Sequence, residues 1–258
     1  MVTGSNLRIA ALVVAFLTVM PSAEAQQTRP PAIESAAAFK GGMQTGFITE
    51  RLSLRQLRVW NSIERIAFAE DRSGHPLHPK LRSLWHWVET GGHAIYVELV
   101  DRKDPAIYHA GTFTVEKSAP MRKNQIPVLR LYLWIIDEAS MGKEVARPDG
   151  FIPFKGLGKN ERYAQVVGHE LAHAALIMDD PDYARLCREL DEEAAKFLLQ
   201  CQGSSIGAAY DQATQQLLSR LKSLTAEVEK PAQAAEVEIW RELLDGQHAT
   251  VAASRGIR

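Results

Sequence analysis

The feature that most constrains the fold is an apolar stretch at residues 166–175 that contains His169, Glu170 and His173. The other residues of this stretch are Val, Gly, Leu or Ala, so none of them is charged. Residues four apart on an α-helix lie on the same face, about one turn from each other. The stretch therefore predicts a buried helix, from about Glu161 to Met178, with both imidazoles on one side.

The two histidines and the glutamate between them indicate a zinc site. Two imidazoles on one helix face can bind a single Zn²⁺ at about 2.0–2.1 Å. Glu170 follows the first ligand and lies beside the metal, where its carboxylate can take a proton from a metal-activated water. The alternative is an amphipathic helix with two buried histidines and a surface glutamate. That alternative leaves unexplained why a charged residue stands between His169 and His173 in an apolar stretch.

A third protein ligand is expected, because catalytic zinc sites usually have three and keep one position open. The continuation typical of metzincins requires Gly and His at positions now held by Leu176 and Asp179. A second predicted helix, residues 182–202, follows Asp180-Pro181 and carries an acidic cluster at residues 189–193. This cluster lies 16 to 20 residues beyond His173, which leaves enough chain for the second helix to pack back against the first.

On these residues, the segment from Val166 to about Leu198 resembles the gluzincins, zinc metallopeptidases whose third ligand is a downstream Glu. In that clan the ligand Glu often has a small residue three positions later, which lets two helices approach. Glu192 has Ala195 at this offset and is the predicted third ligand, whereas Glu193 has Lys196 there and is second. The remaining alternatives are Glu189, Asp191, Asp179 and Asp180.

The resemblance also implies a fold and further roles. A sheet would lie above the active-site helix, with an edge strand that pairs with the substrate backbone, and Val128–Ile136 or Gly111–Glu116 would provide that strand. Gluzincins often use a downstream Tyr or His to stabilise the oxyanion, for which Tyr183, Tyr210 and His248 are the candidates. The motifs that mark individual gluzincin families are absent, so the resemblance extends to the clan only.

The first 25 residues have the three parts of a secretory signal peptide. Arg8 provides the positive charge, Ile9–Met20 is an apolar run of 12 residues, and Ala23-Glu24-Ala25 is a cleavage pattern. The run is too short to span a bilayer, which takes about 20 residues. We therefore expect cleavage after Ala25, export to the periplasm or the extracellular space, and no stable membrane insertion of the mature chain.

The rest of the chain predicts an α+β, zincin-like fold in one domain over residues 47–245. A lead-in at 26–46 precedes it and a tail at 246–258 follows. A sheet-bearing half (47–158) should contain a small, mostly antiparallel sheet, a meander, packed on the active-site helix. A helical half (159–245) should follow. The individual predicted elements are a helix within 47–70, an apolar-aromatic run at 84–88, strands at 94–100, 111–116 and 128–136, and helices at 161–178, 182–202, 206–228 and 232–243.

The composition excludes two classes of protein. With 30 Lys and Arg against 31 Asp and Glu, the chain has no basic excess for binding a nucleic-acid backbone. Its two cysteines, Cys187 and Cys201, lie on one predicted helix and are too far apart to form a bridge. The predicted function is an exported zinc metallopeptidase that acts on peptide or protein substrates. The alternative is an exported binding or scaffold protein whose zincin-like metal site is structural or inactive.

Overall fold

The computed structural model describes residues 45–104, 107, 110–114, 127–139, 153–202 and 212–254. The predicted signal peptide, the lead-in up to residue 44 and Tyr210 lie outside these residues, so export and cleavage after Ala25 stay predictions. The chain divides into two compact units. The larger unit comprises the described residues within 45–103, 110–184 and 229–254. The smaller unit comprises the described residues within 185–228, together with residues 104 and 107.

Four strands of the larger unit form a mixed sheet in the order β1-β2-β4-β3. The strands are β1 (Gly46–Ile48), β2 (Ala94–Val100), β3 (Gly111–Thr114) and β4 (Val128–Tyr132). β1 pairs with β2, and β2 with β4, in parallel, whereas β3 runs antiparallel to β4. The α+β class is confirmed. The expected mostly antiparallel meander is wrong, because parallel neighbours need crossover connections in place of hairpins.

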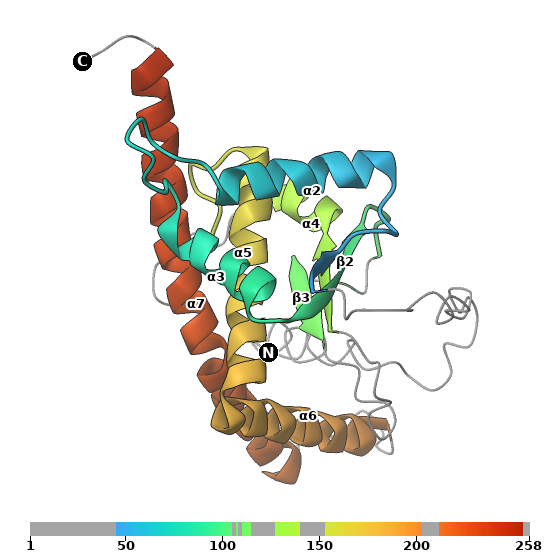
Figure 1. Cartoon of the computed structure of the whole chain (residues 1–258). Helices are drawn as coiled ribbons and strands as arrows, with labels where there is room; N and C mark the ends of the chain where they lie inside the picture. Colours follow the sequence, from blue (N-terminus) through green and yellow to red (C-terminus); the bar gives the residue numbers. More distant parts are fainter. Residues whose placement is uncertain are drawn as a thin grey trace, which may run out of the picture. The chain divides into compact units, whose positions relative to one another are not determined.

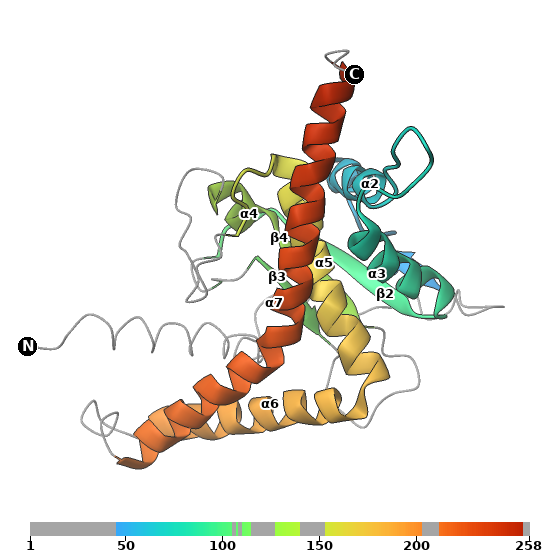
Figure 2. The ribbon, with the colours of Figure 1, turned by 90° about the vertical axis from the view of Figure 1, so that its left-hand side faces the viewer.

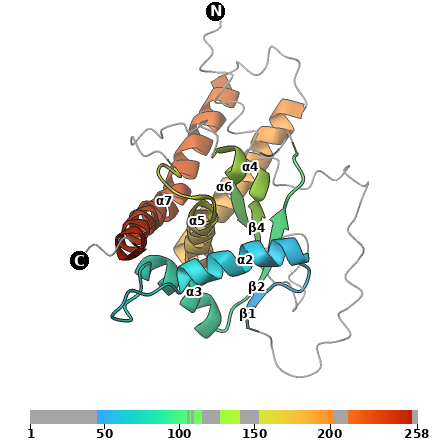
Figure 3. The same cartoon turned by 90° about the horizontal axis from the view of Figure 1, so that it is seen from above.

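Four helices of the larger unit are α2 (Leu54–Ala67), α3 (Pro79–Thr90), α4 (Leu133–Ala139) and α5 (Lys159–Asp179). α2 and α3 lie in the connection from β1 to β2, whereas the connection from β2 to β4 contains β3, and α4 and α5 follow β4. The helix expected within 47–70 begins only at Leu54, after a capping box between Ser53 and Gln56, and the residues before it form β1. The apolar-aromatic run at 84–88 belongs to α3, and the strand expected over 128–136 ends at Tyr132, where α4 follows. Figure 3 shows α2 and α3 next to α5.

The core of the larger unit is built around α5, which contains the predicted active-site helix. α5 lies between the sheet and the C-terminal part of α7 (Gln212–Ser254), as Figures 1 and 2 show. The sheet contributes alternate residues of β2, namely Ile95, Val97 and Leu99, which are buried. From α7, Ala232, Ala235, Ile239 and Leu243 join the same core. α5 is therefore buried on several sides, as its apolar sequence predicts.

The C-terminal helices are longer than expected. α6 (Pro181–Gln202) agrees with the predicted helix, but the two helices expected at 206–228 and 232–243 are one helix, α7, with Pro231 inside it. α7 also continues to Ser254, through most of the predicted tail. Cys187 and Cys201 both lie on α6, where about 1.5 Å of rise per residue places their Cα atoms about 21 Å apart, too far for a bridge. Within the part of the chain described here, no helix has the length and apolar character needed to cross a membrane.

Candidate metal centre

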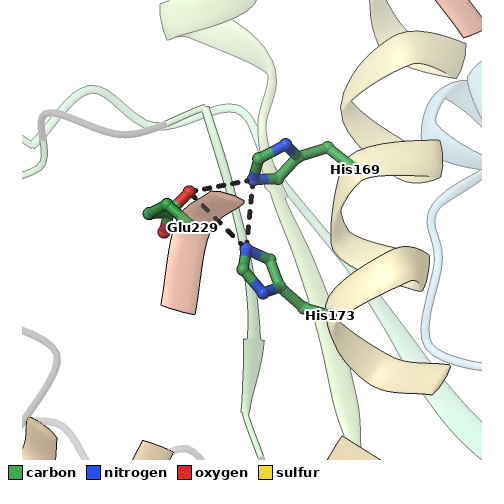
Figure 4. Close-up of side chains that lie close together, drawn as sticks. All are labelled: His169, His173 and Glu229. Atoms are coloured by element: carbon green, nitrogen blue, oxygen red, sulfur yellow. Dashed lines mark hydrogen bonds and ion pairs between the residues drawn. The ribbon is translucent and has the colours of Figure 1, made fainter. Parts of the chain in front are cut away.

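Two imidazoles from α5 meet one carboxylate from α7. His169 and His173 project from the same face of α5, one turn apart, and Glu229 points toward both (Figure 4). The Nε2 atoms of the two histidines lie 3.2 Å apart. A carboxylate oxygen of Glu229 lies 3.4 Å from Nε2 of His169 and 3.6 Å from Nε2 of His173. All three residues belong to the larger unit.

The three distances fit a zinc ion. Ligands about 2.0–2.1 Å from a tetrahedral zinc are about 3.3–3.4 Å from one another. The atoms of His169, His173 and Glu229 approach this spacing, and two His with one Glu is a donor set that catalytic zinc uses. The side chains of the three residues are 17%, 11% and 20% exposed, so the group is largely buried. The three residues could thus hold a metal ion.

Each histidine has a polar neighbour at its other ring nitrogen. Glu236, one of the few buried carboxylates, lies 3.3 Å from Nδ1 of His169, within ion-pair distance but not in hydrogen-bond geometry, and accepts a hydrogen bond of 2.8 Å from the amide of Gln165. The hydroxyl of Tyr183 lies 2.7 Å from Nδ1 of His173. Partners of this kind fix the tautomer of a metal-binding histidine and leave the Nε2 lone pair for the metal.

The charges around the histidines also suit a divalent cation. Burial disfavours a charged His169, but its contacts with Glu229 and Glu236 outweigh that effect and raise its pKa to about 10. Burial of Glu229 opposes its ionisation, yet its close contacts with both histidines hold the pKa of its carboxyl well below the usual range. Together with Glu170, three carboxylates surround two imidazoles. A bound dication would offset this excess of negative charge.

Glu170 is buried beside the histidines on the sheet side of α5. Its side chain is only 7% exposed, and it lies against β3, where a Cβ atom at Gly111 would be 2.9 Å from Cγ of Glu170. Burial raises the pKa of its carboxyl, although the neighbouring His169 and His173 lower it in part. A carboxyl whose pKa lies above its usual value is suited to accept a proton near neutral pH and to release it again.

The structure does not place Glu192, the predicted third ligand, in this group. Glu192 lies on the part of α6 that belongs to the smaller unit, and its side chain is exposed. Glu193 is buried, but it binds Lys196 at 2.7 Å, and Glu189 binds Arg220 at 2.6 Å. Asp191 is half-buried on the same helix. Within the smaller unit, Glu189 and Glu193 therefore belong to a charged cluster with Arg220 and Lys196.

The two aspartates at the end of α5 also have other roles. Asp179 accepts a hydrogen bond of 2.7 Å from the indole N–H of Trp87. Asp180 accepts from the backbone N–H groups of Asp182 and Tyr183, at 2.9 and 3.2 Å, and so caps the N-terminus of α6. This cap fixes the first turn of α6, from which Tyr183 reaches His173.

None of the three residues expected to stabilise the oxyanion, Tyr183, Tyr210 and His248, is placed for this role by a contact in the described part of the chain. Tyr183 contacts the nitrogen of His173 that faces away from Glu229, so it acts on the ligand and is not positioned by this contact toward a substrate. His248 is exposed near the end of α7, and Tyr210 lies outside the described residues. That role therefore has no assigned residue in the part of the chain that the structure covers.

Glu229 and Glu236 were missed because they lie more than fifty residues after His173. A signal was nevertheless present. Glu229 has Ala232 three positions later, the same small-residue offset that favoured Glu192. Ala232 is fully buried, and Glu236 adjoins buried Ala235. Carboxylates bordering an apolar stripe of small residues on a later helix would have pointed to this pair.

A comparison of the chain with family models, with curated proteins and with solved structures finds no match. The function is therefore argued from the site alone.

Proposed function

We propose that this protein is a zinc-dependent metallopeptidase, similar to gluzincins, in which His169, His173 and Glu229 hold the metal. The observation that carries the proposal is the group of three ligand atoms at the spacing of a tetrahedral zinc site, with the buried Glu170 next to it. Glu229 thus takes the place for which the sequence favoured Glu192. The donors are nitrogen and oxygen, which suit Zn²⁺.

In this proposal some residues of the site bind the metal and another, Glu170, transfers the proton. When bound, Zn²⁺ polarises a carbonyl group and lowers the pKa of water. Glu170 accepts the proton of the attacking water and passes it to the leaving amine as the peptide bond breaks. Glu236 and Tyr183 hold the two imidazoles in the tautomer that presents Nε2 to the metal.

A peptide substrate is supported by the position of β3. This strand is at one edge of the sheet, next to Glu170, and an open edge can pair with an extended peptide. Export remains part of the proposal, on the basis of residues 1–25. An exported metallopeptidase would act on peptides or proteins outside the cytoplasm.

The decisive variant is Glu170→Gln, which is similar in size but cannot accept a proton. We expect it to bind as much zinc as the wild type and to lose at least about a hundredfold in peptide hydrolysis, because general-base catalysis typically contributes 10²–10⁴-fold. The measurement is digestion of an unbiased peptide library by the mature chain, with zinc content determined on the same samples. Exposed Glu192→Gln is the matched control and should cleave like the wild type.

Equal hydrolysis by Glu170→Gln and the wild type would contradict the proposed mechanism. A wild type that binds zinc and cleaves no peptide would favour the alternative, an exported binding or scaffold protein with a structural or inactive metal site.

A further inference from the structure

Gln165 is a fully buried residue of α5, one turn before His169. The residues on either side of it, Ala164 and Val166, are buried as well. An amide inside an apolar core costs free energy unless its polar atoms form hydrogen bonds. Gln165 therefore needs a polar partner within the core of the larger unit.

That partner is Glu236 of α7. The amide nitrogen of Gln165 donates a hydrogen bond of 2.8 Å to Oε1 of Glu236, which is buried too. The amide oxygen of Gln165 has no hydrogen-bond partner among the described residues. A hydrogen bond to a carboxylate is stronger than one between neutral groups, so this bond compensates much of the cost of burying the amide.

The other oxygen of the same carboxylate lies next to a metal ligand. Oε2 of Glu236 is 3.3 Å from Nδ1 of His169, within ion-pair distance. Gln165 and His169 are four residues apart on α5 and lie on the same face of the helix. The amide therefore meets one oxygen of Glu236 and the imidazole meets the other, so that two residues of α5 bracket the carboxylate.

We infer that Gln165 is a positioning residue of the metal centre, which holds the Glu236 carboxylate beside Nδ1 of His169. A glutamate side chain has several rotamers, and a hydrogen bond to one oxygen restricts where the other oxygen points. When Nε2 of His169 binds the metal, Nδ1 carries the proton, and a carboxylate fixed beside it orients the ring. This role rests on the proposed zinc site, whereas the hydrogen bond itself does not.

A double-mutant cycle on zinc affinity separates positioning from packing. Methionine is similar in length to glutamine and glutamate and adapts to its surroundings, so Gln165→Met and Glu236→Met mainly remove polar atoms. At one fixed pH, Gln165→Met alone should weaken zinc binding at least about fivefold, because outer partners of metal ligands typically contribute about ten- to a hundredfold. In the Glu236→Met background the same substitution should change zinc affinity less than about twofold, because the carboxylate that Gln165 holds is gone.

Gln56→Met is the matched control. Gln56 lies on α2 of the same unit, and its amide donates a hydrogen bond to the backbone carbonyl of Leu99 in β2. Its substitution removes a side-chain hydrogen bond of the same kind and should leave zinc affinity unchanged. A purely structural Gln165 would lower the thermal stability and not the zinc affinity, or would lower the affinity equally in both backgrounds of the cycle. Either result would overturn the inference.

The hydrogen bond itself is tested by NMR of the side-chain amides in the metal-free mature chain. In Glu236→Met the amide of Gln165 loses its charged acceptor, so its proton signal should shift upfield, while that of Gln56 keeps its position. An unchanged Gln165 signal would overturn the inference, and so would a wild type that binds no zinc. Zinc binding with the expected cycle but without peptide cleavage would count against the proposed function alone.

Discussion

The two histidines of the site differ in the partner behind each ring. His169 faces a carboxylate, Glu236, and His173 faces a phenol, Tyr183. A carboxylate increases the basicity of an imidazole more than a neutral hydroxyl does. His169 should therefore be the stronger of the two nitrogen ligands, and in the metal-free protein its raised pKa favours a protonated ring.

This difference predicts a pH dependence of zinc binding. The pKa of His169 is raised from 6.5 to about 10 in the folded, metal-free protein, so its ring is protonated at neutral pH. Zinc requires the neutral ring and must displace that proton. We expect the zinc association constant to rise about tenfold per pH unit between about pH 6 and 8, with close to one proton released per zinc.

Competition with a chelator of known pH dependence measures this slope. Glu236→Gln is the control, because removing the carboxylate should lower the pKa of His169 and flatten the upper part of the slope. The stability of the metal-free fold depends on pH in the opposite direction to the zinc affinity. A pKa raised on folding stabilises the metal-free fold fully below pH 6.5, and this contribution is lost as the pH rises toward about 10. Zinc affinity independent of pH would contradict the charge state assigned to His169.

At the scale of single residues, the sequence identifies site residues that lie close together along the chain but not those that come from a distant helix. His169, Glu170 and His173 were identified because helical periodicity alone places them together. Glu229 and Glu236 depend on how a remote helix packs, which spacing along the chain does not determine. Glu192 satisfied the local criterion of a small neighbour, but so did Glu229, and only the fold distinguishes the two.

Among the elements, the contact between α5 and α7 completes the site. A Cβ atom at Gly168, next to His169, would lie 2.4 Å from Cδ1 of Ile239. Gly168 therefore leaves room for the Ile239 side chain of α7 one residue away from a metal ligand. The contact between the helices places Glu229 and Glu236 within reach of the imidazoles.

Gly168→Ala should therefore separate the two helices. Overpacking typically costs about 1–3 kcal/mol, partly offset by up to about 1 kcal/mol from the better helix propensity of alanine. We expect a lower free energy of unfolding and weaker zinc binding, measured by thermal denaturation and metal titration. Ile239→Val removes Cδ1 and should restore zinc affinity in the double variant. Wild-type affinity in Gly168→Ala alone would show that this contact does not set the geometry of the site.

Elements set by local sequence signals could be predicted, whereas those set by packing against distant residues could not. α5 and α6 follow from apolar periodicity and from the cap at Asp180, which are local signals. Pro231 lies between the two helices expected at 206–228 and 232–243, and it cannot donate the backbone hydrogen bond of a helix. Burial of Ala232, Ala235 and Ile239 against the core stabilises α7 beyond it. The sheet order was not predictable, because it depends on crossovers and not on the strand sequences.

On the scale of the molecule, the site is assembled from three separate parts of the larger unit. β3 contacts the base, α5 carries the base and two ligands, and α7 provides the third ligand and a supporting carboxylate. Only the α5 part is continuous in sequence. The α+β class follows from the mixture of periodicities, whereas the position of the third ligand requires the complete fold.

The most direct test of the central claim is the zinc affinity of Glu229→Gln compared with that of Glu192→Gln. Both substitutions keep the size of the side chain and remove one carboxylate, so they differ only in position. If Glu229 is the third ligand, its variant should bind zinc at least about a hundredfold more weakly than the wild type, while Glu192→Gln binds like the wild type. Weak binding by Glu192→Gln together with unchanged binding by Glu229→Gln would contradict the site described here.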